Sequence, residues 1–416
     1  MRTRFRAARV LADAHTEFAP GAVVIEDDRI VWVGPDAECP DAERTVDLPE
    51  AVLAPGLVNA HGHLDLAHLK GQLPFRGEFT EWVVGIGGRR GDQDHTEASI
   101  EAIRGAIARG TTTFGDIVAP KSFDSMVHAF ATTGARGRLF VEALGFKPER
   151  ADRVFSEVWE LAEMRELPPR VETGLSPHAP YSVSRDLFAK LLAVADGHGR
   201  PCAVHVAETM EELAFLRHGI GPMREVLKRF EADDPDHEIY GGPREFVETL
   251  ELKSAPLLLV HANYLRPRDV PPGAFVVYCP TAHQFFRHPE HPVMEMVEEG
   301  VRVALGSDSA ASGDTVDILS ETQFLARARF DLDARTVFQM STEWGAMALG
   351  VDSGRLEVGK LADLAAFEPA AGLEVLGMVD ARCVLTVVGG EILHRDESDD
   401  PAAGESEGEG DNPAGN

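Results

Sequence analysis

The sequence predicts an α/β protein built around a (β/α)8 barrel, with a smaller β-sheet domain formed by the two ends of the chain. Three observations support this prediction. Short apolar runs alternate with helical patterns through the middle of the chain, β-prone segments occur at both ends, and polar residues directly follow several of the apolar runs. The length of 416 residues accommodates one large barrel and a satellite domain.

The two ends of the chain share the same β-prone pattern. Near the N-terminus, Ala22–Ile25 and Ile30–Val33 are short apolar runs separated by acidic residues. Near the other end, Leu361–Phe367 and Val384–Val388 have the same character. Runs of this kind, bounded by Gly, Pro or acidic turns, are typical of hairpin strands. We therefore expect residues 1–55 and 361–395 to pair into one small sheet domain.

The middle of the chain, residues 56–360, has a different rhythm. Five apolar runs each end in a polar cluster: Thr111–Ile117, Val171–Leu175, Ala203–Val206, Leu257–Val260 and Val301–Leu305. Between them lie stretches with apolar residues three and four positions apart: Thr96–Arg109, Arg150–Arg165 and Ser184–Ala195. This alternation predicts parallel strands joined by helices. Because the loops of such a barrel converge at the C-terminal ends of its strands, polar residues after the apolar runs are candidates for a site.

Composition narrows the class of protein. The formal net charge of −29 disfavours a nucleic-acid partner. Residues 396–416 are rich in Asp, Glu, Gly and Ser and contain no aromatic residue, which predicts a disordered acidic tail. The four cysteines lack CxxC spacing, which is typical of a reducing compartment. With neither a signal-peptide pattern nor an apolar window of about 18 residues, we expect a cytoplasmic protein without a membrane span.

The first candidate ligands are His61 and His63, directly after the apolar run Leu53–Val58. Residues two apart in an extended strand point to the same side, so both imidazoles can face one metal ion. By itself, this spacing is also typical of two ordinary polar histidines.

A second candidate pair, His205 and Glu208, stands at the end of the run Ala203–Val206. The imidazole suits a metal ion and the carboxyl group suits proton transfer. The alternatives are a buried histidine with ordinary hydrogen bonds and an acid favoured by the dipole at a helix start.

Two further candidates, His261 and Asp308, also follow apolar runs. Burying a carboxylate at a strand end is costly unless it meets a cation or a full set of hydrogen bonds. Asp308 therefore favours a metal site, with a cap of the following loop as the alternative. Taken together, several histidines and one carboxylate at successive strand ends indicate a zinc or iron site with an open position for a nucleophilic water.

Several motifs in order resemble the amidohydrolase superfamily, in the branch of chlorohydrolases and nucleoside or nucleobase deaminases. They are LAPGLVNAHGH (53–63), SPHAPYSV (176–183), HVAE (205–208), HAN (261–263), Cys279-Pro280 and GSDS (306–309). The resemblance extends from Val23 to about Leu393. It implies a distorted TIM (β/α)8 barrel with a small β-sandwich formed by both chain ends.

The resemblance also implies the ligand set. One divalent ion, zinc or alternatively iron, would be bound by His61, His63, His205 and Asp308. Binuclear relatives carry a carbamylated lysine at the end of the fourth strand, and Val171–Ser176 contains no lysine. We therefore expect a mononuclear site.

The implied reaction is hydrolysis of a carbon–nitrogen bond other than a peptide bond, through a metal-bound hydroxide. In that reaction Asp308 accepts a proton from the water, and Glu208 protonates a ring nitrogen and helps ammonia to leave. His261 orients the water, and His178 lies over the substrate. The expected substrate is an aminated purine nucleoside or related heterocycle.

The sequence is compatible with several substrates of this branch. Residues 59–66 and 79–82 look most like aminodeoxyfutalosine deaminases, whereas other members of the branch act on adenosylhomocysteine, methylthioadenosine or guanine. Trp82 is a candidate for stacking on a purine, with helix core as the alternative. After Cys279-Pro280, where relatives usually show Ser-Asn, this chain has Thr281-Ala282-His283, and His283 is a further candidate contact. Its loop, with His288 and His291, is interpreted either as a second metal patch or as a rigid surface or substrate loop.

Other functions stay open at this point. The same attacking water would serve a chlorohydrolase, or a guanine or cyclic-amide hydrolase, because only the leaving group differs. A non-catalytic binding homologue is the remaining alternative, and the intact ligand set argues against it. We expect a small-molecule substrate and no nucleic acid or membrane partner, and family habit favours a homodimer.

Overall fold

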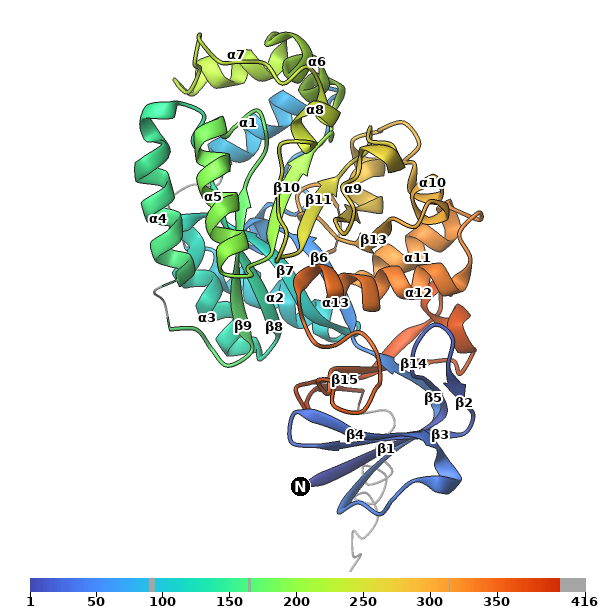
Figure 1. Cartoon of the computed structure of the whole chain (residues 1–416). Helices are drawn as coiled ribbons and strands as arrows, with labels where there is room; N and C mark the ends of the chain where they lie inside the picture. The colour runs from blue at the N-terminus through green and yellow to red at the C-terminus, as the bar shows by residue number, and fades with distance from the viewer. Residues whose placement is uncertain (90–93, 164–165, 314, 397–416) are drawn as a thin grey trace, which may run out of the picture.

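The computed structural model describes residues 1–89, 94–163, 166–313 and 315–396 (Figure 1). Two eight-stranded sheets form its framework, one made from the middle of the chain and one from both ends. The predicted fold, a (β/α)8 barrel with a small β-sandwich from both chain ends, is confirmed. Apart from Asp396, the segment predicted to be a disordered tail lies outside the described residues.

The barrel sheet runs in chain order, and each strand is parallel to its neighbours. Its strands are β6 (Leu57–Gly62), β7 (Thr111–Val118), β8 (Arg136–Ala143), β9 (Val171–Pro177), β10 (Cys202–Val206), β11 (Leu257–His261), β12 (Phe275–Tyr278) and β13 (Arg302–Leu305). A bridge between Gly62 and Asp308 joins the first strand to the segment after the last one. This closure brings the C-terminal ends of β6 and β13 together.

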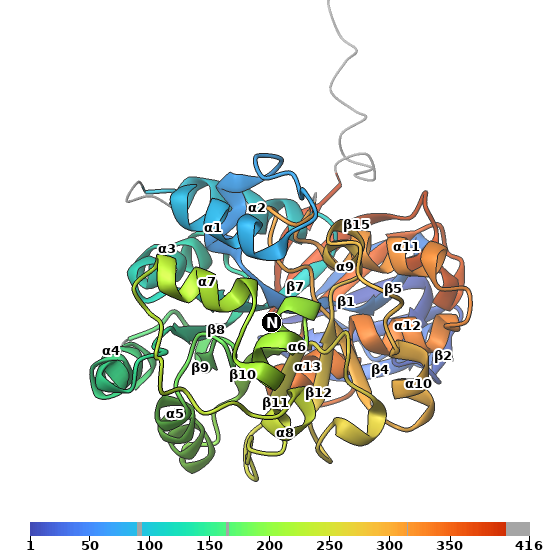
Figure 2. The ribbon, with the colours of Figure 1, turned by 90° about the horizontal axis from the view of Figure 1, so that it is seen from above.

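Helices surround the ring of barrel strands, as the view from above shows (Figure 2). The α-helices are α1 (Phe79–Arg89), α2 (Thr96–Ile107), α3 (Phe123–Thr133), α4 (Ala151–Glu163), α5 (Arg185–Gly197), α6 (Met210–His218), α7 (Pro222–Arg229), α8 (Pro243–Val247), α9 (Pro280–Phe285), α10 (Val293–Glu298), α11 (Ile318–Ala328), α12 (Ala334–Ser341) and α13 (Glu343–Leu349). Short 3-10 helices are η1 (Asp36–Glu38), η2 (Leu64–Leu69), η3 (Pro120–Ser122), η4 (Pro148–Arg150), η5 (Pro267–Asp269) and η6 (Gly372–Gly377). None of the described helices is long and apolar enough to cross a membrane.

The second sheet contains strands from both chain ends. They are β1 (Arg2–Leu11), β2 (Glu17–Phe18), β3 (Gly21–Glu26), β4 (Arg29–Pro35), β5 (Arg44–Pro55), β14 (Leu364–Glu368), β15 (Arg382–Val388) and β16 (Glu391–Arg395). The order is β16-β15-β14-β5-β1-β3-β4, with β2 paired to β1. The antiparallel pairing of β14 with β5 joins the two ends of the chain into one sheet.

A buried ion pair connects the barrel to this sheet. Arg136 at the start of β8 donates from Nε and Nη2 to the two carboxylate oxygens of Asp363, at 2.7 and 2.9 Å. Asp363 directly precedes β14 and also accepts from the backbone N–H of Gly389 at 2.8 Å. Paired, fork-like hydrogen bonds of this kind fix orientation as well as distance. This ion pair therefore links the barrel to the second sheet at a defined position.

Candidate metal centre and active-site cavity

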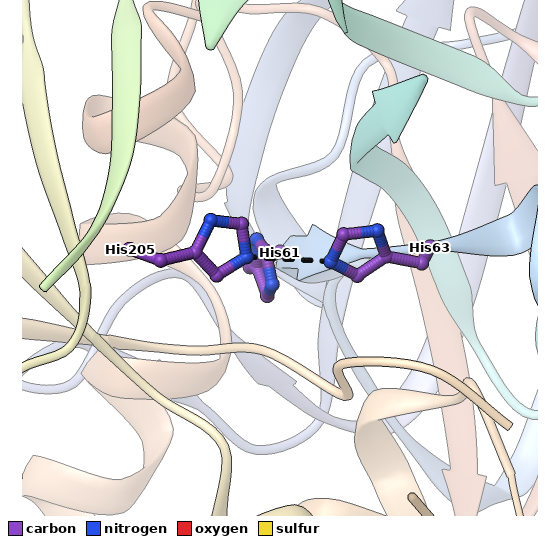
Figure 3. Close-up of side chains that lie close together, drawn as sticks. All are labelled: His61, His63 and His205. Atoms are coloured by element: carbon purple, nitrogen blue, oxygen red, sulfur yellow. Dashed lines mark hydrogen bonds between the residues drawn. The ribbon is translucent and has the colours of Figure 1, made fainter. Parts of the chain in front are cut away.

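The predicted metal ligands come together at the C-terminal end of the barrel. His61 lies in β6 and His63 directly after it, His205 lies in β10, and Asp308 follows β13. All four side chains are buried. Figure 3 shows the imidazoles of His61, His63 and His205 converging on one point. Parallel strands that end at one rim place these side chains together, as the sequence pattern predicted.

The donor atoms form two overlapping groups of three, each close enough for one ion: His61 with His63 and His205, and His61 with His261 and Asp308. His63 Nε2 and His205 Nε2 lie 3.3 Å apart, and Asp308 Oδ1 lies 3.8 Å from Nε2 of both His61 and His63. Two nitrogens bound at about 2.0–2.1 Å to one tetrahedral zinc ion would be roughly 3.3 Å apart. Both ring nitrogens of His61 are buried, and neither has a hydrogen-bond partner among the described residues. The residues therefore fit a divalent metal ion.

Neighbouring groups orient two of these ligands. His205 Nδ1 lies 2.9 Å from the carbonyl oxygen of His178, which can only accept, so Nδ1 carries the proton. The lone pair of His205 is then on Nε2, which faces the site. Asp308 Oδ2 accepts a hydrogen bond from Ser312 Oγ at 2.7 Å, and this bond leaves Oδ1 directed at the histidines.

The barrel closure also fixes the ligands in place. The carbonyl of His61 accepts from the backbone N–H groups of Ser307 and Asp308 at 3.0 and 3.1 Å. The Asn59 side chain accepts from Ser307 N and donates to Ser307 Oγ, so it ties β6 to the segment after β13. The organising role of Asn59 is not visible in the sequence, because it depends on strands that are far apart in the chain.

Glu208 and His261 face each other beside the metal ligands. Glu208 Oε1 lies 3.6 Å from His261 Nε2, and both side chains are buried. Burial, and then the charge of Asp308, raise the pKa of Glu208 well above its usual range. Burial lowers the pKa of His261 to about 3. A protonated carboxyl group beside a neutral imidazole is an arrangement that can deliver a proton.

Asp308 behaves differently from Glu208. Burial alone would raise the pKa of Asp308, but interactions with the imidazoles, that of His61 first, lower it below the usual range for an aspartate. The site thus contains two carboxyl groups whose environments shift their pKa values in opposite directions. This separation is typical of a pair in which one group accepts a proton and the other donates one.

A cavity of about 440 Å³ opens from these residues. Its polar end consists of His63, His205, Glu208, His261 and Asp308. An apolar wall comes from two helices, with Phe79, Trp82, Val83 and Ile86 on α1 and Met223, Val226, Leu227 and Phe230 on and after α7. The remaining polar lining includes Glu142, Lys147, Arg150, His178 and Ser182. A cavity of this size with one polar end is typical of a small-molecule site.

Two of the three predicted substrate contacts line this cavity. His178 and Trp82 do, and Trp82 also packs against Phe286, with ring centroids 4.8 Å apart. His283 is not among the lining residues; it lies beside Tyr278, with ring centroids 5.5 Å apart. The side chain of His283 therefore faces a neighbouring aromatic cluster.

The His-rich loop contacts the backbone of one of the site residues, His261. His291 Nε2 lies 2.9 Å from the carbonyl oxygen of His261, and the His291 ring stacks on Tyr278. Among the described residues, the groups of three potential ligands close enough for one ion do not include His283, His288 or His291. The structure therefore gives the second-metal interpretation of this loop no support.

Glu142 is a cavity residue that the sequence analysis missed. It lies in β8, is buried, and places Oε1 4.0 Å from His178 Nε2. Ser182 Oγ donates to the carbonyl of Ala179 and so accepts from His178 Nδ1, at 2.7 Å. A neutral His178 then has its acceptor on Nε2. Glu142 and His178 thus lie side by side in the lining of the cavity.

Comparison with known proteins gives consistent matches. The Amidohydrolase family model matches residues 52–393, and a model of the bacterial imidazolonepropionase-like composite domain matches residues 21–42. The aminodeoxyfutalosine deaminase of Deinococcus radiodurans is 31% identical over 80% of this chain and 82% of its own. A 5-methylthioadenosine/S-adenosylhomocysteine deaminase of Desulfitobacterium hafniense is 29% identical over 84% of this chain and 80% of its own. The structure of Helicobacter pylori aminofutalosine deaminase with methylthio-coformycin superposes with a TM-score of 0.83 at 20% identity, covering 94% of this chain and 99% of that one.

Proposed function

The chain belongs to the amidohydrolase family, whose members are metal-dependent hydrolases, and on that premise we propose that it deaminates an aminated purine nucleoside or a related heterocycle. The observation that carries the proposal is the position of Glu208. Its side chain lies at the same end of the cavity as His63, His205, His261 and Asp308. The relatives named as deaminases of aminodeoxyfutalosine, methylthioadenosine and adenosylhomocysteine favour those substrates.

We propose that His61, His63, His205 and Asp308 hold a single divalent ion. Three nitrogen donors and one carboxylate favour zinc, with iron as the alternative. When bound, the ion supplies Lewis-acid activation of a water molecule at neutral pH. The carboxylate of Asp308 would take the proton of that water, because its lowered pKa keeps it ionised and therefore able to accept one.

The remaining steps belong to the other carboxyl group and its neighbour. Glu208 donates its proton to a ring nitrogen as the C–O bond forms. It then receives the proton held by Asp308 and passes it to the amino group as the C–N bond breaks, and the proton of the added hydroxyl group returns to Glu208 as the carbonyl forms. The products are the oxo heterocycle and ammonia. His261, 3.6 Å from Glu208, orients the attacking water. Burial of both groups keeps bulk water from this exchange.

The rest of the cavity suits an amphipathic substrate. The heterocycle would lie at the polar end, and an apolar substituent would lie against the wall formed by α1 and α7. Glu142 and His178 would accept hydrogen bonds from substrate hydroxyl groups between these two parts. Trp82 would pack against the substrate from α1, as the sequence analysis expects, and His283 has no direct role in this proposal.

Glu142→Gln should raise KM about 10-fold with kcat nearly unchanged, because a hydrogen bond to a charged acceptor is worth about 1.5–3 kcal/mol. Steady-state kinetics with the best nucleoside substrate measures the effect. The exposed Glu157 on α4 provides a matched control, and Glu157→Gln should match the wild type. A loss confined to kcat would contradict the binding role of Glu142.

The proposed function is tested by ammonia release from purified protein with a measured metal content. The panel contains aminodeoxyfutalosine, adenosylhomocysteine, methylthioadenosine, guanine and chlorinated triazines. We expect ammonia from at least one of the adenine nucleosides and about one metal ion per chain. Chloride release alone would replace the proposal with a chlorohydrolase, and a metal-free, inactive protein would overturn it. Light scattering of the same sample tests the expected homodimer.

A further inference from the structure

We propose that Glu212 is a positioning residue for Glu208, an assignment that rests on the proposed function. The Glu212 side chain is fully buried at the start of α6. Its Oε1 accepts from the backbone N–H of Ala207 and its Oε2 from the backbone N–H of Glu208, each at 2.8 Å. One carboxylate therefore holds two successive N–H groups of the turn that carries Glu208.

The local sequence explains how this contact forms. Thr209 and Glu212 have the spacing of a capping box, and Thr209 Oγ1 accepts from Glu212 N at 3.1 Å. In an ordinary capping box the glutamate reaches back to the N–H of the cap residue itself. Here the two carboxylate oxygens also take the two N–H groups that precede the cap, those of Ala207 and Glu208. A common helix-start motif thus anchors the turn after β10.

The turn needs such an anchor. Ala207 has φ +51°, in the left-handed region that costs energy for a residue with a Cβ atom. On the other side, Asn263 Nδ2 donates to the carbonyl of Glu208 at 2.9 Å, and Ala262 N donates to the carbonyl of Val206 at 3.0 Å. The backbone of Glu208 is thereby held at its N–H by Glu212 and at its carbonyl by Asn263.

A carboxylate is specifically required at position 212. Among the described residues no cation forms an ion pair with Glu212, so burying its negative charge has a high free-energy cost. The two hydrogen bonds from backbone N–H groups offset part of that cost. A glutamine offers one acceptor oxygen and would direct its NH2 group at the second N–H. If Glu212 only capped α6, glutamine at this position would leave the reaction rate nearly unchanged. If Glu212 positions the turn, glutamine would misplace Glu208 and lower the rate.

Glu212→Gln should lower kcat up to about 100-fold while KM changes less than about threefold, because a small misplacement of a catalytic group reduces the rate more than the binding. Metal content should stay at the wild-type value. Hydrogen exchange at the amides of Ala207 and Glu208 should become faster. Glu212→Asp, which keeps both acceptor oxygens on a shorter side chain, should retain more kcat than Glu212→Gln.

The matched control is Asp333→Ala, which removes the side-chain cap of α12, a 2.8 Å bond from Thr336 N. It should lower Tm comparably and leave kcat and the exchange of the Ala207 and Glu208 amides unchanged. Equal kcat losses in both variants, or unchanged exchange at those amides in Glu212→Gln, would overturn the proposal. If wild-type protein deaminates no compound, the proposed function fails, and the exchange measurement still decides whether Glu212 holds the turn.

Discussion

Asp308→Asn should lower kcat by about 10⁴-fold, the upper end of what one proton-transfer group contributes. Asparagine keeps the shape of the side chain and its bond from Ser312 Oγ, but it loses the negative charge that lies 3.8 Å from the His61 and His63 nitrogens. The variant therefore loses a metal ligand and a proton acceptor in one change. Steady-state rates and metal analysis of the purified protein measure the two losses separately.

Ser312→Ala is the informative companion to this variant. It removes the hydrogen bond to Asp308 Oδ2, together with the 3.2 Å contacts of Ser312 Oγ to Ser309, and leaves the carboxylate in place. Loss of such a supporting partner typically costs about 10–100-fold in metal affinity or activity. We therefore expect a graded series, with Ser312→Ala between the wild type and Asp308→Asn. If Asp308→Asn kept more than a few per cent of the wild-type kcat, Asp308 would be neither the proton acceptor nor an essential ligand.

Glu208→Gln should lower kcat about 10³-fold with metal content and KM close to the wild-type values, because only proton delivery is lost. The glutamine amide still fits beside His261, 3.6 Å away, but it has no proton to give to a ring nitrogen. Single-turnover measurements with a saturating substrate would place the loss in the chemical step.

The leaving group provides a sharper test of Glu208. The amino group must be protonated to leave as ammonia, whereas chloride leaves as an anion. A 6-chloropurine analogue of the best substrate should therefore lose less rate in Glu208→Gln than the amino compound does. Glu157→Gln is again the control, because Glu157 is exposed on α4 and does not line the cavity. Equal losses on both substrates would contradict the assigned proton transfer to the leaving group.

Much of the fold could be predicted from the sequence because apolar periodicity reports directly on strands and helices. Two barrel strands were not identified individually. β8 begins with Arg136 and Arg138, two buried arginines whose charges interrupt the apolar pattern. β12 (Phe275–Tyr278) was also not identified, and its length does not explain this, because β13 is equally short. For β8 the information lies in tertiary partners, such as Asp363 for Arg136.

The convergence of His61, His63, His205 and Asp308 at the barrel rim was predictable, because residue type and strand-end position can both be read from the sequence. Residues that act through the backbone of others were not, since their partners are distant in the chain or unremarkable in sequence. Glu142 was missed with its strand, and Glu212 has the sequence pattern of an ordinary helix-start acid. Asn263 belongs to a recognised motif, but its bond to the Glu208 carbonyl depends on how β10 and β11 pair.

The pairing of β14 with β5 also affects how the protein is made. A ribosome completes β1, β3, β4 and β5 before the barrel, but the partner strand of β5 emerges only after the whole barrel. Until then one edge of β5 is unpaired, and Arg136 lacks its ion-pair partner Asp363, which has not yet been synthesised. Open strand edges recruit other chains, so nascent or truncated chains that lack Leu364–Arg395 should depend on chaperones far more than the finished protein.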